Sequence, residues 1–588
     1  MDRLSRLFLI AALLAGAVVP GCRCASGDDR ATTEGEGEGE GEGTGEGAGT
    51  GDAWVEGDLA AQTPDDEGEP VRGGEVTVQI YSNPPSLNPI TDNDWWGSRL
   101  VDHIYGKLVT LDPYDHPGYA VVPELAERWD ISDDKLTYTF HLRRGVKWHD
   151  GHDFTSRDVI ATIDKVMDET VKAAHVRSYF EELESYTAPD DYTVVIKWKR
   201  PYFLALEDPW ASSLVIQPAH IIADMTGAQY NEAATNPLNR APVGTGPFRF
   251  ERWDAMERIV LVRNDEYWGD QPHLDRMTFR HVEDPAIALQ LAERGELDVV
   301  TRILPEPWSR MDSRVLRENY RRSKYYDANY AWIGWNQARP FFADRRVRRA
   351  MTMLMNRERL LQSMFYGVYR LADCHFYFDS PICDYEHDPI PHDPVAAAAL
   401  LDEAGWRDSN GNGVRDKDGV EFEFNFMVPA ASEDARRMGT FMKESFQRAG
   451  ISMDLQPIEW SAFTRRLTEK SFDACTLLWA SSGPRQDPTQ IWHSSSIDGG
   501  SNYIGFRNER ADRLMEEARV ELDESVREAK YREFMQILWE EQPYTFVYVR
   551  PRMSLVHDRI RGVKESLTFF QYADWWIPED QRRNRGGS

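Results

Sequence analysis

Hydrophobic and polar residues alternate along the segment 136–143, and the pattern changes after the short run HDGHD at 149–153. A period of two predicts a strand with one buried face. The apolar positions of this strand are Leu136, Tyr138, Phe140 and Leu142. Beyond HDGHD, apolar residues recur with helical spacing from Val159 to Met167, and Thr155 and Asp158 have the spacing of a capping box. The segment is therefore predicted to be a strand, a turn and a helix.

Strand and helix patterns alternate along the rest of the chain. Predicted strands lie at 76–80, 331–337 and 544–549, a hairpin lies near Phe248 and Arg258, and predicted helices begin near Asp344, Asp393, Ser432 and Arg507. Asp393-Pro394 starts a helix that Gly405 ends, as expected from the preferences of helix termini. Alternation of this kind predicts α/β lobes with mixed sheets. No internal repeat is evident.

The N-terminus has the pattern of an export signal. Arg3 and Arg6 precede a short apolar run that ends in Val19-Pro20-Gly21-Cys22. This ending resembles a bacterial lipobox, which implies cleavage before Cys22 and a lipid on its sulfur. Residues 1–21 are therefore predicted to be a signal peptide, with Pro20 as an unusual residue for the motif. No other apolar run is long enough to cross a bilayer.

Charge is concentrated in the segment after the signal. Residues 23–72 hold 15 acidic and 3 basic side chains, and the whole chain has a formal net charge of -30. Residues 22–73 are therefore predicted to form a lipidated, acidic, disordered tether. The net charge argues against nucleic acid or an anionic membrane surface as a partner.

Two cysteines bracket a short loop. Cys374 and Cys383 enclose HFYFDSPI, and in an oxidising compartment a disulfide between them is predicted. The alternative is a pair of reduced thiols. Cys475 lies in the apolar run ACTLLW and is predicted to be a small buried hydrophobe.

Several segments together resemble the dipeptide/oligopeptide-binding family. Its members are the family 5 extracytoplasmic solute-binding proteins of ABC importers. The segments that carry the resemblance are LTYTFHLRRGVKWHDG with SRDV, PPSLNP, PVGTGPFRF with RNDEYWG, FADRRVRRAM, DPVAAAALLDEAGW, GSNYIGFRN and EEQPYTFVY. The resemblance extends over about 74–577.

The family implies a two-lobed clam fold, α/β with mixed sheets and an extra appended α/β domain. Lobe I is expected to comprise 74–103, 242–324 and 544–588, the appended domain 104–241, and lobe II 325–543. Strands near Ala331 and Tyr544 would form the hinge on which the lobes close around a ligand. The resemblance implies no cofactor and a monomer.

Three motifs have a more specific chemical interpretation. His149 and His152 of HDGHD are interpreted as turn residues, because a catalytic zinc needs three converging ligands and no partner histidine is evident. No metal site is therefore expected there. DSNGNG at Asp408 matches half of a calcium loop, but Gly419 occupies the position of the bidentate carboxylate, so a polar turn is favoured and calcium stays open. No nucleophile-elbow sequence is present.

Ligand-binding residues are assigned from the family, which places several aromatic segments at the cleft. The candidates are Trp95, Trp96, Trp335, Asn336, Trp460, Trp479, Ala480, Ser482, Asp487, Trp492, Asn502 and Tyr503. In the family, the strand around LLWASS supplies backbone hydrogen bonds to an extended peptide, and an aspartate three residues after the tryptophan binds the peptide's amino group. Ser482 occupies that position here, and Asp487 is the substitute candidate.

The sequence is therefore interpreted as a lipid-anchored, non-enzymatic solute-binding protein of an ABC importer, located on the extracytoplasmic face of the cell envelope. Its ligand is expected to be a peptide that it delivers to the permease subunits. An oligosaccharide is the alternative ligand, because aromatic faces also stack on sugar rings. An envelope hydrolase is the alternative from another class.

Overall fold

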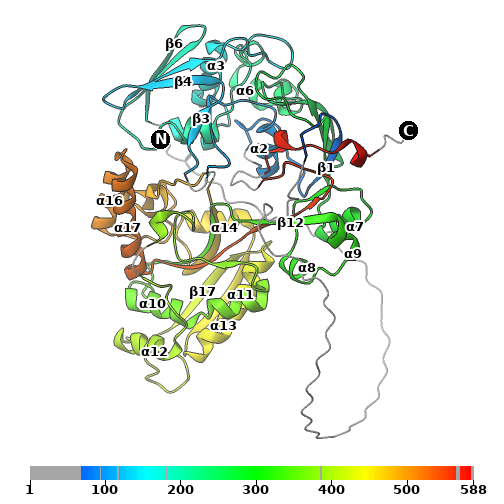
Figure 1. Cartoon of the computed structure of the whole chain (residues 1–588). Coiled ribbons are helices and arrows are strands. Elements are labelled where there is room, and N and C mark those ends of the chain that lie inside the picture. Colours follow the sequence, from blue (N-terminus) through cyan, green and yellow to red (C-terminus); the bar gives the residue numbers. More distant parts are fainter. Residues whose placement is uncertain are drawn as a thin grey trace.

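The computed structural model describes residues 68–583, except for 93, 116–117, 181, 385–386, 482 and 565–569 (Figure 1). The predicted signal peptide, the predicted lipidation site Cys22 and residues 22–67 of the predicted acidic tether lie outside the described residues. Within the described part, no helix combines the length and apolar character needed to span a membrane.

A seven-stranded mixed sheet forms the first lobe. Its order is β12-β21-β11-β1-β10-β9-β8. The strands are β1 (Glu75–Ile80), β8 (Phe248–Asp254), β9 (Arg258–Arg263), β10 (Arg276–His281), β11 (Val299–Val300), β12 (Tyr320–Tyr325) and β21 (Arg552–His557). β1 is parallel to β10, whereas β8 and β9 form the predicted antiparallel hairpin. The helices of this lobe are α2 (Trp95–Val101), α7 (Pro285–Glu293), α8 (Pro305–Ser309) and α9 (Arg314–Asn319).

A six-stranded mixed sheet forms the second lobe, in the order β14-β20-β13-β19-β17-β18. The strands are β13 (Asn329–Trp335), β14 (Arg370–Leu371), β17 (Glu423–Pro429), β18 (Ser452–Ile458), β19 (Ala474–Ala480) and β20 (Tyr544–Val549). The helices are α10 (Arg345–Leu354), α11 (Arg357–Phe365), α12 (Pro394–Glu403), α13 (Glu433–Arg448), α14 (Trp460–Thr468), α15 (Thr489–Trp492), α16 (Glu509–Arg519) and α17 (Glu524–Glu541). Alternate side chains of β13 are buried in two different cores, since Ile333 packs in one and Trp332 in the other.

A separate four-stranded antiparallel sheet lies at the top of Figure 1. Its strands are β4 (Ala126–Ile131), β5 (Thr137–Leu142), β7 (Thr193–Trp198) and β6 (Leu183–Asp190). β5 and the helix α3 (Ser156–Met167) are the strand and helix predicted from the hydrophobic pattern. The capping box of Thr155 and Asp158 is present, and apolar side chains from Val159 to Val166 are buried. The short helix α5 (Ala219–Ile222) contacts α3.

The chain crosses twice between the two large sheets, once between β12 and β13 and once between β20 and β21. Asp327, in the first crossing, and Arg552, at the start of β21, form an ion pair of 2.7 Å. Asn329 and Arg550 exchange hydrogen bonds, with Asn329 Nδ2 donating to the Arg550 carbonyl and Arg550 N–H donating to Asn329 Oδ1. Side-chain and backbone contacts therefore join the two crossings directly.

One domain boundary differs from the expectation. β20, which sequence reasoning assigned to lobe I, pairs with β13 in the six-stranded sheet. The chain therefore changes sheet at 550–551 instead of at 544. The strands expected to form the hinge both belong to lobe II, and the crossings lie beside them.

Candidate ligand-binding cleft

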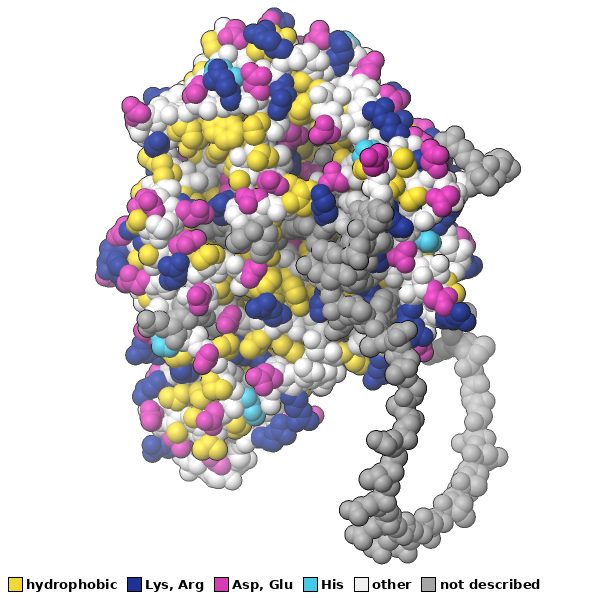
Figure 2. Space-filling model, viewed as in Figure 1, with side chains coloured by type: hydrophobic (Ala, Val, Ile, Leu, Met, Phe, Trp, Pro, Cys, Tyr) yellow, Lys and Arg dark blue, Asp and Glu magenta, His cyan; other side chains and the backbone are white. Residues whose placement is uncertain are grey.

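A cavity of about 2320 Å³ is lined by residues of both lobes and of the region that holds the four-stranded sheet. Tyr81 and Arg302 come from the first lobe, Tyr202 from the segment between β7 and β8, and Tyr330 and Trp479 from the second lobe. Figure 2 shows hydrophobic side chains gathered between the upper and lower parts of the molecule, among charged residues. A cleft with walls from separate lobes buries a ligand on several sides.

One edge of β19 is open where the strand reaches the cavity. Ser481 N–H donates to the Ala328 carbonyl at 2.8 Å, which continues the β13 ladder. Because peptide groups alternate in direction along an antiparallel strand, the N–H and C=O of Leu478 and Ala480 point to the opposite edge. β17 pairs with that edge only as far as Cys475, and no other strand of the described residues pairs with it. Within the described part of the chain these groups have no strand partner, and Ala480 lines the cavity.

Trp479 contributes an aromatic wall next to this edge. Its ring stacks against Trp332 at 5.7 Å and Tyr503 at 6.2 Å between ring centroids. The side chain is largely buried but lines the cavity, as does Ala480. This part of the cleft can cover an apolar group without demanding its identity.

A second wall combines aromatic rings with arginines. Tyr81 stacks on Trp95, and Arg552 lies over the Trp95 ring at 4.7 Å. Arg99 lies over the same ring at 5.5 Å, and Arg302 over Tyr81 at 5.3 Å. Trp95 lines the cavity as predicted, but its faces are occupied by guanidinium groups, so it favours polar or anionic parts of a ligand.

Carboxylates gather at another part of the lining. Asp487 accepts from Thr489 N–H at 3.0 Å and lies 3.4 Å from Arg519 Nε. Burial, and then the neighbouring Glu207 carboxylate, raise the pKa of Asp208 to about 8, and Tyr202 donates its hydroxyl to Asp208. The cavity therefore holds a carboxyl group that is mostly protonated at neutral pH.

His375 is a lining residue that sequence reasoning missed. Its Nδ1 lies 2.7 Å from Tyr330 Oη and accepts from Trp492 Nε1 at 3.1 Å. Burial lowers the pKa of His375 to about 3, so the ring is neutral, and with Nδ1 as acceptor the proton resides on Nε2. This buried Nε2 has no partner among the described residues. Its position in the loop bracketed by Cys374 and Cys383, which are disulfide-bonded, was the one available signal in the sequence.

Three predicted tryptophans lie outside the lining. Trp96 is buried in the core of the first lobe, because neighbouring helix positions differ by about 100° and α2 turns Trp95 to the cavity instead. Trp335 packs on Phe342 and donates to Thr545 Oγ1 at 3.1 Å. Trp492 is fully buried, and its Nε1–H donates to His375 Nδ1. Their assignment to the cleft surface is therefore wrong.

The remaining candidates also have structural roles or positions away from the lining. Asn336 donates to the Phe472 carbonyl, Asn502 donates to the Phe506 carbonyl, and both amides are buried. Trp460 begins α14 and stacks on its neighbour Phe463. The Tyr503 ring stacks against Trp479 and does not line the cavity. Ser482 lies outside the described residues. Of the predicted set, Trp95, Trp479, Ala480 and Asp487 line the cavity.

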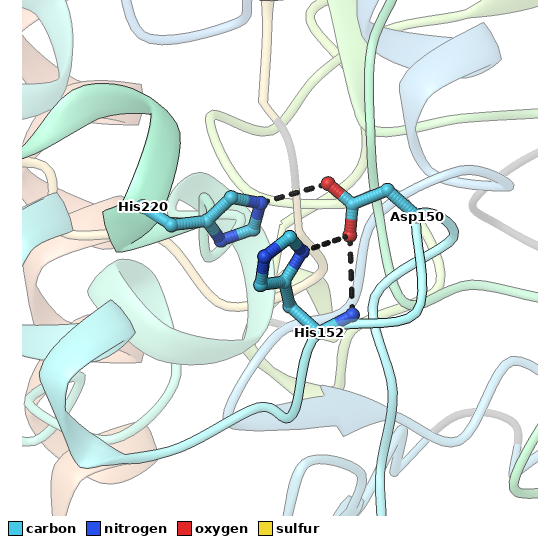
Figure 3. Close-up of side chains that lie close together, drawn as sticks. All are labelled: Asp150, His152 and His220. Carbon is cyan, nitrogen blue, oxygen red and sulfur yellow. Dashed lines mark hydrogen bonds and ion pairs between the residues drawn. The ribbon is translucent and has the colours of Figure 1, made fainter.

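The two metal-like motifs have different outcomes. In the DSNGNG loop, Asp408 Oδ1 accepts from the N–H groups of Gly411 and Asn412, and Oδ2 accepts from Gly413. These bonds hold the loop in a turn, and the choice between a polar turn and a calcium loop stays a prediction. In HDGHD, however, the expectation that no partner histidine lies near is wrong. His220, which is 70 residues after Asp150 in the sequence, lies beside Asp150 and His152 (Figure 3).

Comparison with known proteins agrees with this architecture. The model of the bacterial extracellular solute-binding proteins, family 5 (middle), matches residues 120–501, more than half of the chain, and the chain belongs to this family. It is a solute-binding protein and not an enzyme.

The alignments with individual relatives extend over most of both chains. Oligopeptide-binding protein AppA of Bacillus subtilis is 28% identical over 524 residues, 87% of this chain and 93% of AppA. Its structure in complex with a nonapeptide has a TM-score of 0.71 and covers 87% of this chain and 100% of that one, at 27% identity. Di/tripeptide-binding protein 1 of Pseudomonas aeruginosa is 26% identical, covering 76% of this chain and 85% of that protein. NikA of Brucella suis in complex with Fe(III)-EDTA, at 23% identity and a TM-score of 0.75 over 86% of this chain and 100% of that one, shares the fold.

Proposed function

We propose that this protein is the lipid-anchored solute-binding component of an ABC importer and that it captures peptides in the cleft between its lobes. The observation that carries the proposal is the open edge of β19, which offers the N–H and C=O groups of Ala480, a residue that lines the cavity, and of Leu478 next along the same edge. An extended peptide can add to such an edge as a further strand. The names of the relatives, an oligopeptide-binding and a di/tripeptide-binding protein, support the same ligand class.

In this proposal, backbone pairing supplies affinity and the walls supply limited selectivity. Trp479 covers an apolar side chain of the peptide, and His375 lines the same cavity. Asp487 is the proposed partner of the peptide's ammonium group, although that group would have to share the carboxylate with Arg519. The bound peptide closes the lobes, and the closed monomer delivers it to the permease.

The proposal is tested with peptides that lack single backbone donors. Peptides that co-purify with the protein from its host are identified by native mass spectrometry and resynthesised with one N-methylated residue at a time. Pairing to a strand edge uses every second peptide group, so methylation at alternate positions should weaken binding. We expect roughly tenfold losses at those positions, from a lost hydrogen bond of about 1.5 kcal/mol, and little change between them. N-terminally acetylated peptides in the same calorimetric series report on Asp487.

Losses without a period of two would remove the strand-edge mode. A co-purifying oligosaccharide, with no stabilisation by any peptide, would replace the ligand class. Stabilisation of the protein by peptides that are recovered intact is the expected result, since a binder does not consume its ligand. The comparisons do not favour the oligosaccharide or hydrolase alternatives.

Attachment to the membrane is proposed to depend on Cys22. Cys22→Ser removes the sulfur that would carry the lipid, while the described fold is untouched. We expect the variant to lose lipid attachment almost completely, measured as incorporation of radiolabelled palmitate, and to be left as unprocessed or soluble chain. Cys24→Ser, two residues away, is the matched control and should keep the label. Label retained in the Cys22 variant would contradict the anchor.

A further inference from the structure

Asp150, His152 and His220 form a compact group on the surface of the region that holds the four-stranded sheet. One nitrogen of each imidazole and the carboxylate oxygens all lie within 4.8 Å of one another. His220 Nε2 lies 2.7 Å from Asp150 Oδ2, and His152 Nδ1 lies 3.1 Å from Asp150 Oδ1. Figure 3 shows both rings directed at the same carboxylate. Among the described residues this is the one group of three or more histidine, cysteine or acidic side chains with such convergence.

These separations suit a shared metal ion. Zinc takes histidine nitrogen at about 2.0–2.1 Å and carboxylate oxygen at about 2.0–2.2 Å. Two such ligand atoms on one ion lie roughly 3 Å apart, given those bond lengths and an angle near 90–110°. The observed contacts of 2.7 and 3.1 Å are close to this separation. An ion can therefore replace the shared protons if the imidazole rings rotate to direct both nitrogens at it.

The backbone already holds the three residues in place. Asp150 and His152 belong to a tight turn in which Gly151 N–H donates to the Trp148 carbonyl and Trp148 N–H donates to the His152 carbonyl. His220 lies in α5, and the residue before it, Ala219, donates its N–H to Asp158 Oδ1 at 2.7 Å. The two imidazole rings are stacked, with centroids 3.9 Å apart, so a ring must tilt out of the stack for both nitrogens to face one ion. The backbone positions of the three residues are thus fixed by elements that do not depend on a metal, and side-chain rotation completes the site.

Exposure and ligand chemistry also fit an ion. Asp150 presents one carboxylate oxygen to each of the two imidazole rings. The His152 side chain is 60% exposed, which leaves room for water molecules to complete the coordination. Two imidazoles and one carboxylate select ions such as Zn²⁺, Ni²⁺ or Co²⁺ over Mg²⁺, which prefers oxygen ligands.

We infer that Asp150, His152 and His220 form a binding site for a divalent transition-metal ion, with Zn²⁺ as the test ion. The site is separate from the cleft, since none of the three residues lines the cavity. It joins the β5–α3 turn to α5, two segments about 70 residues apart in sequence. A bound ion would therefore cross-link this region and stabilise it against unfolding.

The test uses the full-length chain without a histidine tag, stripped with EDTA and desalted. Zinc is titrated in competition with a chromogenic indicator, for the unmodified protein and for His152→Ala, His220→Ala and His141→Ala. His141 is the matched control, because it lies 2.7 Å from Asp130 and belongs to no group of three such ligands in the described structure. Thermal unfolding with and without zinc is measured in parallel.

We expect one zinc site per chain that His152→Ala and His220→Ala each weaken at least about tenfold, since loss of even an outer-shell partner costs 10- to 100-fold. His141→Ala should retain the site, and zinc should raise the unfolding temperature only where the site is intact. Magnesium should compete poorly. Identical zinc titrations of the unmodified protein and the His152→Ala variant would overturn the inference, as would equal loss in His141→Ala. His152 is exposed, so its variant decides the question if His220→Ala does not fold.

Discussion

Asp327→Asn is expected to lower the free energy of unfolding by roughly 3 kcal/mol, the low end of the range for breaking a buried ion pair. The Asp327 carboxylate lies 2.7 Å from Arg552 Nε, and both side chains are 15% exposed. Asparagine keeps the shape but leaves the Arg552 charge without its counter-ion where the chain crosses between the two lobes. Urea unfolding at neutral pH measures the loss.

The effect has a defined pH dependence. Burial raises the pKa of Asp327, but the charge and hydrogen bond of Arg552 outweigh it, and the folded-state pKa is lowered. The unfolded chain therefore binds the proton first as pH falls, and the stability from this pair is present above about pH 4 and lost below it. The difference between the unmodified protein and Asp327→Asn should shrink in that acidic range.

Asp130→Asn is the matched control. Asp130 also has a lowered pKa, chiefly through its hydrogen bond with His141, but its side chain is 68% exposed. Exposed pairs are screened by solvent and contribute little, so this variant should unfold almost as the unmodified protein does. An equal decrease in the free energy of unfolding for Asp327→Asn and Asp130→Asn would show that the Asp327–Arg552 pair stabilises the fold no more than an exposed pair does.

The second large effect is expected from the double variant Cys374→Ser/Cys383→Ser. The disulfide closes a loop between residues nine apart in sequence, with Cα atoms 5.7 Å apart. On the chain-entropy account, a cross-link over so short a loop restricts the unfolded chain by about 2.5–3 kcal/mol. His375 lies inside the loop and in the cavity lining, so peptide affinity should fall together with stability.

Denaturant unfolding of oxidised protein measures this change, and a reductant supplies the control. Dithiothreitol should lower the stability of the unmodified protein to that of the double variant and leave the variant itself unchanged. Unreduced peptide mapping should find the two cysteines linked. Equal stability of the oxidised protein and the variant would contradict the expected contribution of the bond.

Local chemistry is the part of this structure that the sequence predicts well. The period of two before HDGHD and the helical spacing after it correspond to β5 and α3, and the capping box forms as predicted. The hairpin of β8 and β9 and the pairing of Cys374 with Cys383 also depend on residues close together in the chain. Each of these features is determined by interactions within a few residues, which a hydrophobic pattern or a spacing records.

The binding residues show where that kind of reasoning ends. Trp95 and Trp96 are equivalent in sequence, yet α2 turns one to the cavity and the other to the core. The family resemblance places Trp335 at the cleft, but both faces of β13 are buried and Trp335 lies in a core. An aromatic residue packs equally well in a core or at a cleft, and only the neighbouring lobe decides which it meets.

By itself, then, the sequence determined the elements, the α/β class and the membership of a solute-binding family. The tertiary structure alone decided which strand edge stays open, where β20 pairs, and that His220 completes a group with Asp150 and His152. The physical reason is the same in each case. Strand pairing and side-chain convergence join residues tens to hundreds of positions apart, and the free energy that selects these contacts comes from the packing of whole sheets and helices, which no local pattern contains.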